Sequence, residues 1–98
     1  ATVARYHELL RAPGVRDAML ARLRQWRAAG PVPMLARVTA PTLLLWGSED
    51  RFIPPAQAQD FVRALPQAHA VLLPGLGHVP QEEDAATSLV PVLDFLAR

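Results

Sequence analysis

The chain has 98 residues, of which 51% are hydrophobic and 19% are charged, and its formal net charge is +1. This length allows one domain at most, or part of one, and the composition excludes a disordered chain. The absence of cysteine excludes disulfides, thiolate nucleophiles and cysteine-based metal sites.

Neither nucleic acid nor a membrane is an expected partner. The net charge is small, and the six arginines of residues 1–30 accompany no nucleic-acid-binding motif. We interpret these arginines as solvated helix faces, with an acidic ligand as the less favoured alternative. No apolar run approaches the ~20 residues of a membrane span, and no signal peptide is recognisable. Together with the lack of cysteine, this favours a cytoplasmic protein. The start at Ala1 rather than Met indicates a trimmed or truncated chain.

Two amphipathic helices are expected before the first strand. Thr2–Arg11 carries apolar residues at helical spacing. After a break at Pro13-Gly14 the spacing resumes over Val15–Ala29, and Gly30-Pro31 is typical of a helix end. An apolar stripe runs along the second helix, and we interpret it as core packing rather than as a wall facing a substrate. Its members are Val15, Met19, Leu23 and Trp26.

The best-defined element is a short apolar run at Thr42–Trp46. It predicts a strand buried on both faces, as in a parallel sheet. A helix over Ala56–Leu65 and a second strand over Ala70–Leu73, with His69 as an alternative start, complete a βαβ unit, whose two strands run parallel. A last helix begins near Gln81, where carboxylates suit its first turn, and extends to Leu96. Pro91 is expected to kink or break this helix.

Two residues with catalytic chemistry follow the two predicted strands. Asp50 comes four residues after the first strand, and His78 follows the second strand in a loop with two glycines. Because functional groups of parallel sheets gather at the carboxyl ends of strands, we expect the two side chains to meet. A carboxylate bonded to a histidine ring N–H fixes the tautomer and stabilises the protonated form, so the histidine can act as general base and then general acid. On this pattern alone, a turn role for Asp50 and a plain loop role for His78 stay open.

The same two strand ends carry motifs of a known family. The segment VTAPTLLLWGSEDRFIPP contains an apolar strand followed by G-x-x-D-x-x-x-P, and LLPGLGHVPQEED contains a closing strand, a G-H dipeptide and an acidic helix start. In these features residues 38–96 resemble the C-terminal part of the α/β-hydrolase superfamily. The resemblance implies that Asp50 is the triad acid and His78 the triad base, in the family's order of nucleophile, acid and histidine.

The resemblance also implies a fold of class α/β. The expected architecture is a C-terminal βαβα fragment of an α/β-hydrolase core over residues 38–98, with two parallel strands. Residues 1–37 would be the end of a helical cap and the helix that returns to the sheet.

The family's nucleophile elbow, G-x-S-x-G, is absent from this chain. Its two serines are Ser48, which we interpret as a turn residue, and Ser88, which lies in a predicted helix. We therefore predict the C-terminal fragment of a serine-type hydrolase that acts on a small apolar substrate, either an ester or a carbon–carbon bond next to a ketone, and that is inactive alone. Phe52 and Val79 flank the catalytic pair and are candidate pocket residues. We expect no cofactor, and no H-E-x-x-H spacing supports a metal.

The sequence is compatible with two alternative functions. The chain could be a non-catalytic remnant that serves as a binding or self-assembly module. The outer edge of its first strand would then pair with the missing N-terminal part of the same protein or with a second copy. The same fold could also carry haloperoxidase or haloalkane dehalogenase chemistry, since these enzymes differ at the nucleophile.

Overall fold

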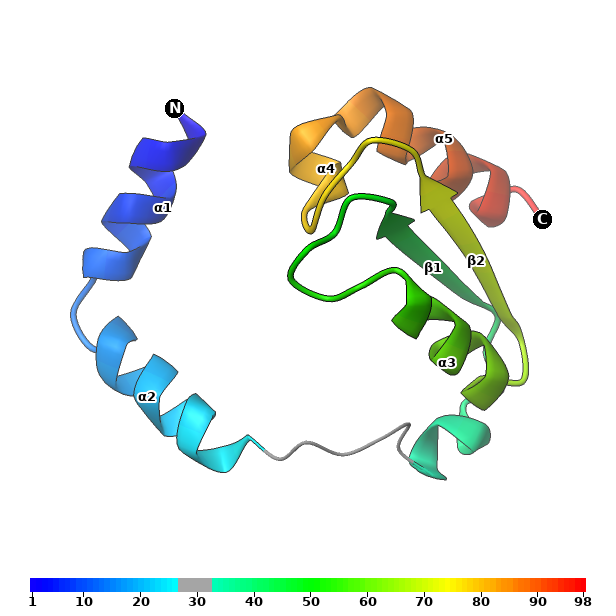
Figure 1. Ribbon diagram of the computed structural model, residues 1–98, viewed down its shortest axis with the longest axis horizontal. Helices are drawn as coiled ribbons and strands as arrows, with labels where there is room; N and C mark the ends of the chain where they lie inside the picture. Colours follow the sequence, from blue (N-terminus) through cyan, green and yellow to red (C-terminus); the bar gives the residue numbers. More distant parts are fainter. Residues whose placement is uncertain (27–32) are drawn as a thin grey trace.

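The computed structural model describes residues 1–26 and 33–98, and these form helices around a two-stranded parallel sheet (Figure 1). The elements, in chain order, are α1 (Thr2–Arg11), α2 (Val15–Gln25), the 3-10 helix η1 (Pro33–Arg37), β1 (Thr42–Gly47), α3 (Ala56–Ala64), β2 (Ala68–Leu73), α4 (Pro80–Glu83) and α5 (Ala85–Leu96).

The predicted βαβ unit is confirmed. β1 and β2 pair in parallel, from Thr42 opposite Ala68 to Gly47 opposite Leu73. Helix α3 connects the two strands and packs on the sheet, where the ring of Phe61 lies 6.0 Å from that of Trp46. β2 begins at Ala68, one residue before the earliest predicted start at His69, because its pairing with β1 extends through Ala68.

The prediction that the first strand is buried on both faces is wrong for this structure. Residues Thr42–Trp46 are half-buried, and only Gly47 of β1 is buried. Three hydrophobic residues of the described chain are buried, namely Ala58, Leu65 and Leu73. The physical reason is the small number of layers, because α3 and α5 alone cannot cover both faces of the sheet.

Helices α1 and α2 form an arm that extends to one side of the sheet (Figure 1). No residue of either helix is buried. The radius of gyration is 16.0 Å, whereas a compact chain of this length would have about 13 Å. Helix α1 is hydrogen-bonded to α4, since the hydroxyl of Tyr6 donates to the carboxylate of Glu82 at 2.9 Å.

The apolar stripe of α2 does not pack in a core, so this prediction is wrong as well. Met19, Leu23 and Trp26 are 49%, 68% and 68% exposed. Helix α2 also ends earlier than predicted, because Trp26 is already extended. The spacing of apolar residues does not by itself fix where a helix ends. The remainder of the predicted helix and its stop at Gly30-Pro31 lie outside the described residues.

The last helical segment is divided at Asp84 and not at Pro91. Asp84 has extended backbone angles, and its carboxylate accepts hydrogen bonds from the N–H and the hydroxyl of Thr87, which caps α5. Helix α5 continues through Pro91. A proline this far along the helix removes one backbone hydrogen bond, and the structure tolerates that loss. In the described part of the chain, no helix is long and apolar enough to cross a membrane.

Ser88 fixes the angle between α4 and α5 and is not available for chemistry. Its side chain is buried, and its hydroxyl donates to the carbonyl of Pro80 at 2.8 Å. Replacing Ser88 with alanine should lower the free energy of unfolding by about 1 kcal/mol. The loss stays small because the same carbonyl also accepts the N–H of Asp84. Urea denaturation measures this difference, and an unchanged midpoint would contradict the assigned role.

Candidate active site at the carboxyl ends of the strands

Asp50 lies in the turn after β1, and the fold fixes both of its carboxylate oxygens. Oδ1 accepts the backbone N–H groups of Phe52 at 2.9 Å and Ile53 at 2.8 Å. Oδ2 lies 2.9 Å from Nδ1 of His78. The residue is 7% exposed, so its orientation is set by these three partners rather than by solvent.

His78 approaches from the loop after β2, as predicted. Its ring contacts the buried carboxylate on one side, while 46% of its side chain remains exposed. An ionised carboxylate only accepts hydrogen bonds, so Nδ1 is the nitrogen that carries the proton in the neutral ring. Nε2 is then left as the acceptor. This is the tautomer that a general base requires.

The two loops meet because Gly47 ends β1 without a side chain. A Cβ atom at this position would collide with the carbonyl oxygens of Leu76 and Gly77. This close approach allows two hydrogen bonds between the loops. The N–H of Glu49 donates to the carbonyl of Leu76 at 2.8 Å, and the N–H of Gly75 donates to the hydroxyl of Ser48 at 2.8 Å. The two loops are thereby joined on the strand side of the Asp50–His78 pair.

The surroundings of Asp50 favour its charged form. Burial alone would raise the pKa of Asp50, but the hydrogen bonds from His78, Ile53 and Phe52 together bring the pKa below its ordinary value. Asp50 is therefore ionised throughout the neutral range. A fixed negative charge beside Nδ1 can stabilise the imidazolium that forms when Nε2 takes up a proton.

Of the two predicted pocket residues, Phe52 lies directly against the histidine. The ring centroids of Phe52 and His78 are 4.9 Å apart in an edge-to-face arrangement, and Phe52 is 78% exposed. Val79 follows His78 and is 36% exposed. A role in substrate binding remains a prediction for both.

The serines are placed as predicted from the sequence. Ser48 lies in the turn after β1 with its oxygen bonded to Gly75, and Ser88 is buried in α5. Among the described residues, no three histidine, aspartate or glutamate side chains form a group that could hold a metal ion.

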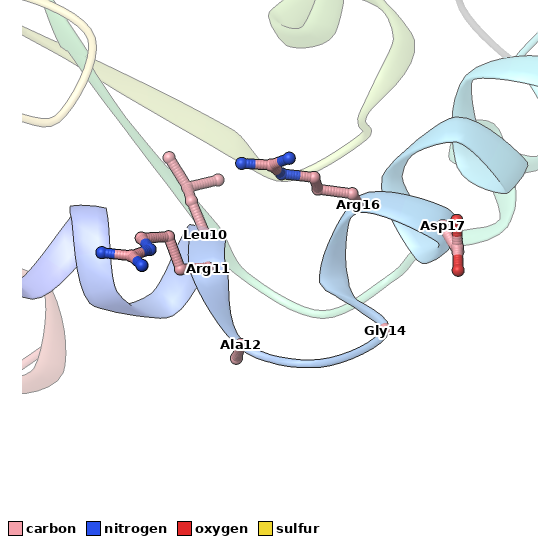
Figure 2. Close-up of a pocket in the computed structure, with 6 residues that line it drawn as sticks. All are labelled: Leu10, Arg11, Ala12, Gly14, Arg16 and Asp17. Carbon is pink, nitrogen blue, oxygen red and sulfur yellow. The ribbon is translucent and has the colours of Figure 1, made fainter.

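Two surface hollows lie on the N-terminal arm, and neither is lined by Asp50 or His78. One, of about 380 Å³, lies at the junction of α1 and α2. Figure 2 shows Leu10 and Arg16 directed to the same side of this junction, with Asp17 on another side of α2. The other, of about 350 Å³, lies where Tyr6 meets Glu82. Both are shallow hollows on exposed helices.

Sequence analysis missed one residue of the site. The carboxylate of Glu83 accepts the N–H groups of Gly77 and Val79, the two neighbours of His78. The available signal was its place five residues after the histidine, within the acidic run at the helix start, which we had interpreted only as favourable helix electrostatics.

The structure contains a parallel βαβ unit with a carboxylate–histidine pair at its strand ends. The sequence motifs at these positions are those expected for a class of hydrolases. The model of the "Alpha/beta hydrolase family" matches residues 2–90. The chain belongs to this family, and its α/β fold with two parallel strands corresponds to a short part of larger relatives.

Individual relatives are similar to the chain over most of its length. It is 36% identical over 90 residues to "Putative carbamate hydrolase RutD" of Pseudomonas savastanoi pv. phaseolicola, covering 92% of this chain and 34% of that protein. It is 39% identical over 64 residues to "2-hydroxy-6-oxononadienedioate/2-hydroxy-6-oxononatrienedioate hydrolase 1" of Dechloromonas aromatica, covering 65% of this chain and 22% of that protein.

A solved structure has a similar fold. A membrane phospholipase A, described as a bacterial virulence factor, is similar with a TM-score of 0.78 and 27% identity, covering 93% of this chain and 29% of that one. The chain thus spans between 22% and 34% of the length of these three relatives. The relatives are hydrolases by name, and they support a hydrolase as the source of this chain.

Proposed function

We propose that the chain is the C-terminal part of a serine-type hydrolase and supplies two members of its catalytic triad. The observation that carries the proposal is the 2.9 Å contact between Asp50 and His78 at the ends of two neighbouring parallel strands. The nucleophile would come from a part of the protein outside this sequence. The complete protein, which is the product of the full reading frame that encodes this chain, would then hold the whole triad.

The proposed roles follow from the geometry. His78 takes the proton of the nucleophile's hydroxyl on Nε2 while the nucleophile attacks the carbonyl carbon, and it then returns the proton to the leaving group. Asp50 holds the Nδ1–H tautomer and offsets the positive charge that the ring carries between these two steps. No step needs a metal or cofactor.

The proposed substrate is small and apolar, with an ester or a carbon–carbon bond next to a ketone as the bond to be cleaved. Support comes from the exposed ring of Phe52 beside His78 and from relatives named as hydrolases of 2-hydroxy-6-oxo dienoate and dienedioate compounds.

Removing the ring of Phe52 should weaken substrate binding more than chemistry. In the complete protein, Phe52→Ala should raise KM about fivefold and change kcat by less than about twofold. The reason is that an apolar contact between Phe52 and the substrate stabilises the bound ground state and the transition state alike. Steady-state kinetics on a short-chain aryl ester measures both constants. Arg51→Ala is the control in the same turn, since Arg51 is the exposed neighbour of Phe52. A fall in kcat with KM unchanged would contradict the pocket role.

We further propose the division of the chain made from the sequence, with residues 1–37 as the end of a cap and the helix that returns to the sheet, and residues 38–98 as core. The separate arm of α1 and α2 supports this division. The remaining partner is the missing N-terminal part of the same protein, which would pair with the outer edge of β1. Within the described residues, β1 pairs with β2 alone. The predicted cytoplasmic location stays a prediction.

The function is tested by comparing the complete protein with the 98-residue chain. The complete protein should hydrolyse a short-chain aryl ester or a vinylogous diketone, and the 98-residue chain should not. In the complete protein His78→Gln should abolish turnover, whereas His69→Gln, at an exposed histidine near the start of β2, should not. Turnover that survives His78→Gln would overturn the proposal.

One observation favours a second candidate, a non-catalytic assembly module. Large apolar side chains are exposed on α2 and on α5, and in the described part of the chain β1 has a strand neighbour on one edge only. Each of these surfaces is suited to pairing with a second copy. Light scattering of the 98-residue chain decides the point, because a monomer at all concentrations excludes self-assembly. Haloperoxidase or dehalogenase chemistry on the same fold is distinguished by the identity of the nucleophile in the full reading frame.

A further inference from the structure

The carboxylate of Glu83 is bonded to the backbone on both sides of His78. The N–H of Gly77 lies 3.0 Å from each of its oxygens, and the N–H of Val79 lies 3.2 Å from Oε2. Hydrogen bonds to an ionised acceptor are stronger than those between neutral groups. One carboxylate therefore holds the backbone that carries the histidine.

Gly77 allows this contact because it has no side chain. A Cβ atom there would lie 3.0 Å from Oε1 and 3.2 Å from Oε2 of Glu83, which is tighter than ordinary packing. The same stretch of loop is held from the opposite direction by the N–H of Glu49, which donates to the carbonyl of Leu76. The loop is thus fixed between the turn after β1 and the end of α4.

The ring of His78 has few other restraints. Nearly half of the side chain is exposed, and the ring contacts the carboxylate of Asp50 and lies edge-to-face with the ring of Phe52. Burial therefore does not set the direction of the ring. Its position depends on the backbone from which it projects, and small displacements of a catalytic group are costly in rate.

We propose that Glu83 is a positioning residue for His78, fixing the loop so that Nδ1 remains within hydrogen-bond distance of Asp50. This inference rests on the proposed function for its kinetic consequence. In this role Glu83 acts through the backbone N–H groups of Gly77 and Val79.

The test uses Glu83→Ala and Glu83→Gln in the complete protein. Glu83→Ala should lower kcat about tenfold and leave KM within about twofold, because it removes two charge-assisted bonds that orient the base. Glu83→Gln keeps one acceptor oxygen and should recover about half of this loss on a logarithmic scale. Glu82→Gln is the control on the same helix turn, since Glu82 bonds to Tyr6 and not to the loop, and its kcat should equal that of the parent.

A spectroscopic measurement separates this inference from the proposed function. In Glu83→Ala, amide hydrogen exchange at Gly77 and Val79 should speed up about tenfold, and the downfield resonance of the His78 Nδ1–H should broaden, while Glu82→Gln leaves both unchanged. Equal exchange and equal kcat in Glu83→Ala and Glu82→Gln would overturn the positioning role. If His78→Gln keeps full turnover, the proposed function fails, but the exchange data still decide whether Glu83 holds the loop. Where Glu83→Ala does not fold, Glu83→Gln decides by the same criteria.

Discussion

Replacing Asp50 with asparagine in the complete protein should lower kcat by about 10⁴-fold, with a small effect on KM. The structure fixes which way the new amide would face. The backbone N–H groups of Phe52 and Ile53 already donate to Oδ1 and require an oxygen there. The amide nitrogen would then occupy the place of Oδ2, 2.9 Å from Nδ1 of His78.

An amide nitrogen in that place donates a hydrogen bond, so Nδ1 must become the acceptor. The proton of the neutral ring then moves to Nε2, which can no longer take a proton from a nucleophile. The variant should remain folded because both backbone N–H groups keep their acceptor. Glu49→Gln is the matched control, since Glu49 is the neighbouring acid in the same turn and is exposed. A kcat for Asp50→Asn within about threefold of the parent would contradict the role of Asp50.

Replacing Gly47 with alanine should destabilise the protein by about 3 kcal/mol and abolish turnover with it. The added methyl group would meet the carbonyl oxygens of Leu76 and Gly77, which are backbone atoms and cannot turn aside. Relief requires the two loops to separate. That movement breaks the bond from Glu49 to Leu76 and withdraws His78 from Asp50.

Gly75→Ala provides the contrast. Gly75 has a φ of 75°, so alanine there is strained, but nothing lies within 4 Å of the new Cβ atom. Its expected cost is about 1 kcal/mol, which is the price of a left-handed backbone alone. Urea denaturation of the two variants of the complete protein gives the comparison. If Gly47→Ala lowered the free energy of unfolding no more than Gly75→Ala does, the close approach of the two loops at Gly47 would be contradicted.

The βαβ unit and the meeting of Asp50 with His78 were predictable from sequence because they depend on local signals. An apolar run ended by Gly47 marks a strand, and parallel neighbouring strands bring their following loops to one edge of the sheet. The resemblance of the two segments to a known family identified the same residues. The roles of Asp50 and His78 in catalysis stay predictions.

Burial was not predictable in the same way. Whether the faces of Thr42–Trp46 and the stripe of Met19, Leu23 and Trp26 are covered depends on which other elements pack against them, and an apolar pattern does not reveal this. The pattern shows only that these side chains are suited to burial.

Glu83 was missed for a related reason. Its contact with the loop depends on α4 ending at Glu83, before the extended Asp84, whereas the sequence pointed to Pro91 as the site of a break. Charge spacing in an acidic run does not reveal which carboxylate turns back toward the preceding loop.

The most direct test of the central claim is active-site labelling of the complete protein with a fluorophosphonate, followed by mapping of the modified peptide. If this chain supplies the acid and the base to a nucleophile outside it, the label attaches to a residue of the complete protein that is not among these 98. Labelling should then be lost in His78→Gln and preserved in His69→Gln. A label within this chain, or full labelling of His78→Gln, would contradict the claim.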